Sequence, residues 1–214
     1  MNRSYVTIPL LFISLYMTAQ TATLSPAGEY YLRGVMETAS GFKLDKDGTF
    51  QFFLSYGALD RFGSGVWAAK DDHIFFNSPE KHSSDFALKQ SGKQEGDGIT
   101  VKIIDSNAMM LRHVYCIIQS GNKKQQAVAD AEGTMFFAAQ DIDSITLLFE
   151  FCPERESIIA IPVKDHNYFE FRFEPWIMDV FFKNFSLQVH ETELSGAHPM
   201  LEGSNYHYEK AGKQ

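Results

Sequence analysis

Short alternating segments of apolar and polar residues begin the body of the chain. The segment 49–56 alternates, with apolar residues on one face and Gln51, Phe53 and Ser55 on the other, and the segment 42–45 precedes it across Lys46-Asp47-Gly48. A three-residue loop with glycine in the left-handed region predicts a hairpin that pairs Leu44 with Phe50. This register is favoured because the apolar faces of the two strands then coincide.

The same pattern continues to the end of the chain. A second hairpin is predicted from 65–70 and 73–77 across Asp71-Asp72, with Trp67 opposite Phe76. Further short strands are predicted at 85–89, 99–103, 111–118, 126–129, 144–151, 157–163, 168–173, 177–182 and 185–189. Many short strands at even spacing are typical of β-sandwiches and barrels. Because sustained helical spacing is missing after the first twenty residues, we expect an all-β fold.

A glycine-rich stretch at residues 90–98 marks the best internal boundary. The segment before it offers too few strands for a closed barrel of about eight. We therefore expect residues 24–90 and 174–210 to form one discontinuous β-barrel, with residues 98–173 inserted as a β-sandwich. Two sequential domains, with the tail added to the second, are the simpler alternative.

The inserted segment carries recognisable motifs. They are the opening strand 99–104 followed by Asp105, the strand around Val114-x-Cys116, and the stretch Ala-Asp-Ala-Glu-Gly-Thr at 129–134. On these motifs, residues 99–163 resemble the carboxypeptidase regulatory-like domain, a transthyretin-type β-sandwich. The resemblance implies a noncatalytic module that packs beside other domains or presents them.

A weaker resemblance covers residues 28–89. The motifs are Gly28-Glu29-Tyr30-Tyr31-Leu32, Asp47-Gly48-Thr49-Phe50 and Gly65-Val66-Trp67. They are similar to the start of a small lipocalin-like barrel. The expected fold is therefore a lipocalin-like barrel or half-barrel plus a transthyretin-like β-sandwich.

Residues 1–22 have the layout of a secretory signal peptide, with a positive start at Arg3, an apolar run at 6–17 and small residues at 18–22. The run is too short to cross a ~30 Å hydrocarbon core, which needs roughly 20 residues. We expect cleavage, no transmembrane span in the mature chain, and export to the periplasm or exterior of a Gram-negative cell. A buried N-terminal helix or strand is the alternative.

The charge balance bears on the partner. The chain has 19 Lys and Arg against 27 Asp and Glu, and loss of Arg3 with the signal peptide leaves a net charge of −9. Such an acidic chain is repelled by nucleic acid and by anionic lipid. The sequence has no basic cluster of five or more residues to reverse this locally, so we expect no nucleic-acid binding.

The two cysteines of the chain, Cys116 and Cys152, are compatible with a disulfide in an oxidising compartment. Closing a loop of about 36 residues would stabilise the fold by roughly 3–4 kcal/mol in the chain-entropy description. Two buried free thiols are the alternative.

Catalytic and metal-binding motifs are missing from the sequence. It has no Gly-x-Ser-x-Gly, no glycine-rich phosphate loop and no His-Glu-x-x-His. The turn at 45–49 begins like a calcium loop, but its fifth position is Thr49 and its twelfth is Tyr56 rather than Glu. We expect no catalytic residue, no metal ligand and no cofactor.

Aromatic side chains are the candidates for ligand binding, namely Tyr31, Tyr56, Trp67 and Phe76. In a small barrel such side chains fill the core, and in a wider one they border an apolar pocket for a lipid or quinone. A third alternative places Tyr56 and Trp67 at a rim, where they stack on sugar rings.

The expected function is an exported noncatalytic binding or interaction module of the cell envelope. Its partner would be an envelope protein, a glycan or an apolar small molecule. A structural or adhesion component is an alternative that predicts a filled barrel and an exposed apolar patch or strand edge. An enzyme of unrecognised type would instead require perturbed acids or histidines clustered in a cleft, for instance around His166, Glu170 and Arg172.

Overall fold

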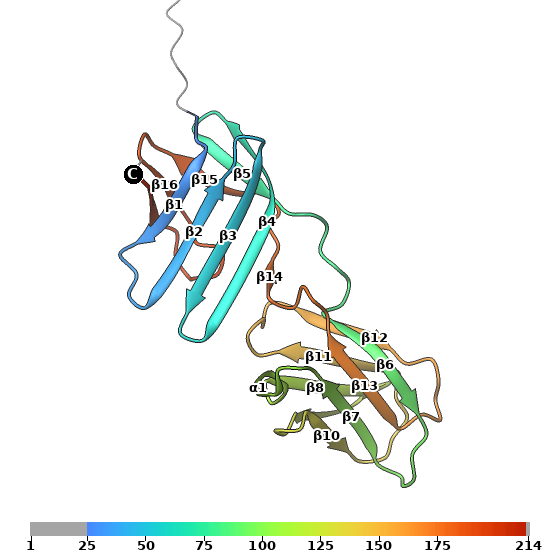
Figure 1. The fold of residues 1–214 in the computed structure, drawn as a ribbon. Helices are drawn as coiled ribbons and strands as arrows, with labels where there is room; N and C mark the ends of the chain where they lie inside the picture. The colour runs from blue at the N-terminus through green and yellow to red at the C-terminus, as the bar shows by residue number, and fades with distance from the viewer. Residues whose placement is uncertain (1–24, 213–214) are drawn as a thin grey trace, which may run out of the picture.

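The computed structural model describes residues 25–212, and this part of the chain is all-β (Figure 1). The predicted signal peptide lies outside the described residues. A single short helix, α1 (Ala108–Leu111), accompanies the strands described here. The strands are β1 (Gly28–Arg33), β2 (Thr38–Leu44), β3 (Thr49–Tyr56), β4 (Leu59–Lys70), β5 (His73–Asn77), β6 (Phe86–Gly92), β7 (Ile99–Ile104), β8 (Val114–Ser120), β9 (Lys123–Val128), β10 (Thr134–Phe137), β11 (Ser144–Phe149), β12 (Glu156–Ala160), β13 (Tyr168–Phe173), β14 (Asp179–Val180), β15 (Phe185–Val189), β16 (Glu193–Gly196) and β17 (Tyr206–Lys210).

Eight strands close into an antiparallel barrel. Their order around the ring is β1-β2-β3-β4-β5-β15-β16-β17, and β17 pairs with β1. Consecutive strands of the chain pair within β1–β5 and within β15–β17. Two further pairs, β5 with β15 and β17 with β1, join strands that are far apart in the chain and close the ring. The short strand β14 adds to β4 in parallel. Strands from both ends of the chain thus share one ring.

The predicted hairpin registers are confirmed. Leu44 pairs with Phe50 in the first hairpin, and Trp67 pairs with Phe76 in the second. Gly48 has φ +85°, the left-handed conformation that the three-residue turn requires. These registers turn one side of β2, β3 and β5 into the barrel, where Phe42, Phe52 and Phe76 are buried.

The barrel interior is packed with aromatic rings. The Phe42 centroid lies 5.0 Å from that of Phe52 and 4.8 Å from that of Phe76. Phe182, from the segment after β14, lies edge-on to Phe50 at 5.1 Å. Offset and edge-to-face pairs of this kind add about 0.5–1.5 kcal/mol each beyond burial. The inward aromatics therefore form a filled core.

The remaining strands form two four-stranded sheets, β10-β7-β13-β6 and β12-β11-β8-β9. Their inner faces share one cluster of buried apolar side chains, so they form a sandwich. Strand β6 pairs with β13, from Phe86 opposite Phe173 to Gly92 opposite Tyr168. The barrel's first segment consequently ends with β5, before the boundary expected at residue 90, because Phe86 packs into the sandwich core.

The barrel and the sandwich lie end to end (Figure 1). Two stretches of chain connect them, one between β5 and β6 and one after β13 that includes β14. Within residues 25–212, no helix has the length and apolar character needed to cross a membrane.

Candidate functional site

A network of buried polar contacts lies where barrel and sandwich meet. Arg61, on β4 of the barrel, is completely buried. Its guanidinium donates to the backbone carbonyls of Phe151, Met178 and Asp179. It also donates to the Glu154 carboxylate at 2.6 Å. A barrel residue is thus held by the turn after β11 and by the connecting segment.

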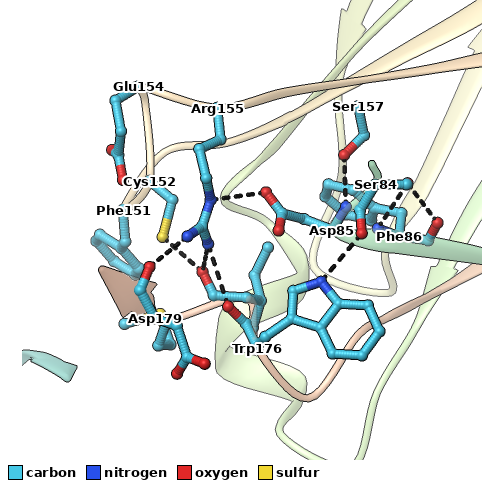
Figure 2. A network of polar contacts seen from close by, with 12 residues as sticks. Ser84, Asp85, Phe86, Phe151, Cys152, Glu154, Arg155, Ser157, Trp176 and Asp179 are labelled. Carbon is cyan, nitrogen blue, oxygen red and sulfur yellow. Dashed lines mark hydrogen bonds and ion pairs between the residues drawn. The ribbon is translucent and has the colours of Figure 1, made fainter. Parts of the chain in front are cut away.

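A second buried arginine completes this joint (Figure 2). Arg155 donates through Nε to the Asp85 carboxylate at 2.8 Å. The rest of its guanidinium donates to the backbone carbonyls of Trp176, Ile177 and Asp179. Arg155 therefore ties the sandwich to both connecting stretches.

The carboxyl groups of the joint respond to burial and to the arginines. Burial raises the pKa of Asp85, and the ion pair with Arg155 opposes this rise. Burial also raises the pKa of Asp179. For Glu154, burial is the largest single influence and acts in the same direction, but the hydrogen bond from Arg61, a backbone hydrogen bond and the charges of Arg61 and Arg155 together outweigh it, so the pKa is lowered. The arginine donors are taken up by protein acceptors, so the joint has the properties of a structural clamp.

The cysteines are free and buried in this structure, so the disulfide that the sequence allowed is not formed. Cys116 lies in the middle of β8, between Leu147 and Ala127 of the neighbouring strands. Cys152 follows β11 at the joint, where its thiol donates to the Ile177 carbonyl at 2.8 Å. Burial raises the pKa of Cys152 to about 11 and raises that of Cys116 as well. Neither supplies a reactive thiolate at neutral pH.

A buried serine–histidine pair in the barrel is also structural. His198 Nδ1 accepts hydrogen bonds from the backbone N–H groups of Met200 and Leu201. Nε2 therefore carries the proton and donates to Ser40 Oγ at 3.0 Å, and Ser40 donates to the Phe53 carbonyl. Because this histidine donates to the serine, it does not act as its base. Burial lowers the pKa of His198 to about 4.

The four candidate ligand residues do not form one site. Phe76 is buried in the barrel core. Trp67 packs against that core and donates through Nε1 to the Asp45 carbonyl. Tyr56 is exposed at the end of β3, and Tyr31 is exposed on the outer wall. Two of the four thus stabilise the barrel, and two face solvent at separate places.

Tyr31 belongs to an aromatic row on the outer wall of the barrel. Strand registers align Tyr31, Gly41, Phe53 and Phe62 across β1–β4. The rings of Tyr31 and Phe53 meet edge to face at 6.3 Å over Gly41. The adjacent row is polar, with Glu29, Lys43 and Gln51, and both rows line a hollow of about 260 Å³. The sequence could have indicated that Phe53 lies outside the barrel, because it falls among the polar positions of the alternating segment 49–56.

The sandwich carries a different surface, which we call the apolar face. It is the outward side of sheet β12-β11-β8-β9, where Ile158, Val128 and Tyr115 are 66%, 51% and 44% exposed. Ile117 and Leu148 lie between them and line a hollow of about 610 Å³. The structural or adhesion alternative predicts an exposed apolar patch, but the sequence did not assign it to these strands, although they have apolar residues on both sides.

The three residues of the enzyme hypothesis lie on or just before β13, and His166 and Arg172 line different hollows. His166 lines a polar hollow of about 1010 Å³ at the loop end of the sandwich. Arg172 lines another hollow, beside the joint, and Glu170 accepts a hydrogen bond from the Tyr168 hydroxyl. No group of three or more metal-ligating side chains occurs within residues 25–212.

Comparisons with protein-family models, with curated proteins and with solved structures found no match to this chain.

Proposed function

We propose that this protein is an exported, noncatalytic interaction module of the cell envelope. In this proposal the filled barrel is a scaffold, and the sandwich presents a docking surface for a protein. We further propose that the barrel is lipocalin-like, which its up-and-down order of eight strands supports. The two four-stranded sheets likewise support a carboxypeptidase regulatory-like sandwich.

The observation that carries the proposal is the apolar face. Contiguous exposed apolar side chains on soluble proteins mark interaction sites, whereas single ones are ordinary. Here Ile158, Tyr115 and Val128 come from three different strands of one sheet. They surround the half-buried Ile117 and Leu148, which is the arrangement of an interface core.

The buried joint supports the same function. Arg61 and Arg155 fix the connecting stretches by hydrogen bonds to backbone carbonyls. A docking surface held in a defined orientation loses less entropy when a partner binds. In this proposal the joint lets the barrel hold the apolar face of the sandwich in a fixed orientation.

Site-specific photocrosslinking in the source cell tests this proposal. A photoreactive benzoylphenylalanine replaces Tyr115 of the full-length chain, and the matched control replaces Tyr56, which is 52% exposed on the barrel. We expect a protein adduct from position 115 that is missing from position 56. If position 115 gives no adduct, docking on the apolar face is wrong. N-terminal sequencing of the protein from the same cells tests cleavage near residue 22.

The aromatic row supports a second candidate function, weak binding of a neutral glycan. The apolar C–H face of a pyranose packs on aromatic rings, and its hydroxyls hydrogen-bond to polar groups such as Glu29 and Gln51. NMR titration with cellohexaose and N-acetylchitohexaose at millimolar concentration tests it. Saturable shifts at the row, lost in Phe62→Ala and kept in Val66→Ala, are expected. Unchanged spectra with both sugars would refute this candidate.

A further inference from the structure

We infer that the occupant of the apolar face is a second copy of this chain, in a two-fold symmetric, face-to-face dimer. The inference rests on the proposed docking function of that face and names the partner. It is carried by the arrangement of side chains that the strand registers impose.

The registers lay the outward side chains of this sheet on a regular grid of four strands by three rows. The rows, in the order β12, β11, β8 and β9, are Glu156, Leu148, Tyr115 and Val128; then Ile158, Thr146, Ile117 and Gln126; then Ala160, Ser144, Gln119 and Lys124. With strands ~4.8 Å apart and rows ~6.8 Å apart, the grid is nearly square, about 14 Å on each side.

The charges sit at two diagonally opposite corners of this grid, Glu156 at one and Lys124 at the other. The remaining corners, Val128 and Ala160, are apolar. A two-fold axis along the Val128–Ala160 diagonal exchanges the charged corners. Glu156 of each copy then faces Lys124 of the other, so the contact forms two symmetric ion pairs, one on each side of the axis.

The same axis brings apolar side chains together. Val128 lies on the diagonal and Ile117 lies beside it, so each meets its own counterpart. Because the grid is square, the strands of the two copies cross at about 90°, which is one of the two preferred geometries of sheet packing. The charge complementarity is confined to Glu156 and Lys124. The chain as a whole is acidic, so two copies repel each other elsewhere.

The size of the face sets the expected strength. A grid about 14 Å on each side is smaller than the ~800 Å² per partner of a standard interface. We therefore expect a dimer that dissociates in the micromolar range and weakens at high salt.

Sedimentation equilibrium of the mature full chain, over micromolar to submillimolar concentrations, tests the inference. The expected mass rises from monomer to dimer. Val128→Lys abolishes the dimer, whereas Val66→Lys, at a barrel position that is 58% exposed against 51% for Val128, leaves it unchanged. Circular dichroism melts confirm that each variant is folded.

A charge swap tests the proposed arrangement. Glu156→Lys and Lys124→Glu each weaken the dimer at least tenfold, and the double variant restores it. A chain that stays monomeric, or a dimer that survives Val128→Lys, overturns the inference, and failure of the swap to restore the dimer overturns the diagonal geometry. If the chain is a monomer, but position 115 still gives an adduct in cells whose mass is not that of a dimer of this chain, the proposed function stands with a different partner. Loss of that adduct refutes both.

Discussion

The barrel and the sandwich bury their apolar faces in different ways, and they differ in whether their strands leave free edges. In the barrel, the ring β1–β5 with β15–β17 closes on itself, so these strands have no free edge among them. In the sandwich, β6, β9, β10 and β12 each pair on one side only. Closure removes the liability of exposed strand edges, and an open sandwich has to manage it by other means.

The sandwich blunts its edges with side chains. The Gln125 amide on β9 donates to the Ala138 carbonyl and accepts from the Ala138 N–H, as a strand residue would. On the opposite side, the Ser157 hydroxyl at β12 accepts from the Asp85 N–H just before β6. Two of the four edges, β9 and β12, are thus engaged by side-chain hydrogen bonds.

The largest expected loss of stability follows from breaking the joint between the barrel and the sandwich. Arg155→Met leaves Asp85 buried without its cation, so we expect a loss of about 3–5 kcal/mol in the free energy of unfolding. We also propose that the barrel and the sandwich then unfold in two separate transitions, as two domains. Urea denaturation followed by tryptophan fluorescence and by circular dichroism measures both effects.

The control for this prediction is Arg33→Ala, which removes an exposed ion pair with Glu209. Exposed pairs contribute at most about 1 kcal/mol. Equal losses in both variants would contradict the buried role of Arg155. Restoration of part of the stability by Asp85→Asn in the Arg155→Met background would support it.

We expect mild acid to lower the stability of the barrel through His198. The unfolded chain binds a proton near pH 6.5, whereas the native histidine has a pKa of about 4. The contribution of neutral His198 to the free energy of unfolding is therefore complete above pH 6.5. It is lost as the pH falls toward 4, by roughly 3 kcal/mol. Chemical denaturation across this range, compared with His198→Gln, isolates the effect. The exposed His207→Gln serves as the control, and identical pH profiles for wild type and His198→Gln would refute the prediction.

A smaller effect distinguishes two tyrosines inside the barrel. The Tyr208 hydroxyl is buried and has no hydrogen-bond partner among the described residues, whereas the Tyr30 hydroxyl donates to the Pro26 carbonyl at 2.8 Å. We expect Tyr208→Phe to stabilise the protein by about 1 kcal/mol and Tyr30→Phe to destabilise it by a similar amount. Thermal unfolding of both variants measures the difference, and a destabilised Tyr208→Phe variant would show that its hydroxyl has a partner.

The last prediction concerns reactivity rather than free energy, and it lies in the sandwich. Both thiols are buried, so a thiol reagent is expected to modify neither Cys116 nor Cys152 in the native protein. Unfolding without a reductant exposes two reactive thiols per chain. Finding none after unfolding would mean that the two cysteines are bonded.

Local pattern accounts for the hairpins and their registers. Alternation and turn chemistry act over a few residues, so Leu44 opposite Phe50 and Trp67 opposite Phe76 were readable directly from the sequence. The assignment of β6 was not, because its partner β13 lies about eighty residues further along the chain. Phe182 was likewise expected in a strand, whereas it fills the barrel from a connecting segment.

Functional residues followed the same division. The aromatic candidates were identified by residue type, and the structure separated the buried Phe76 from the exposed Tyr31 and Tyr56. Arg61 and Arg155 gave no sequence signal, since a buried arginine is recognised only by the carbonyls that converge on it from distant segments.

The sequence by itself determined that the body of this protein is β-structure, and where its first hairpins turn, because period and turn residues are local properties. Only the tertiary structure decided that β17 meets β1 to close the barrel, that two arginines form the joint, and that Ile158, Val128 and Tyr115 share one exposed side of a sheet. These features depend on contacts between residues far apart in the chain, whose free energies no local pattern encodes.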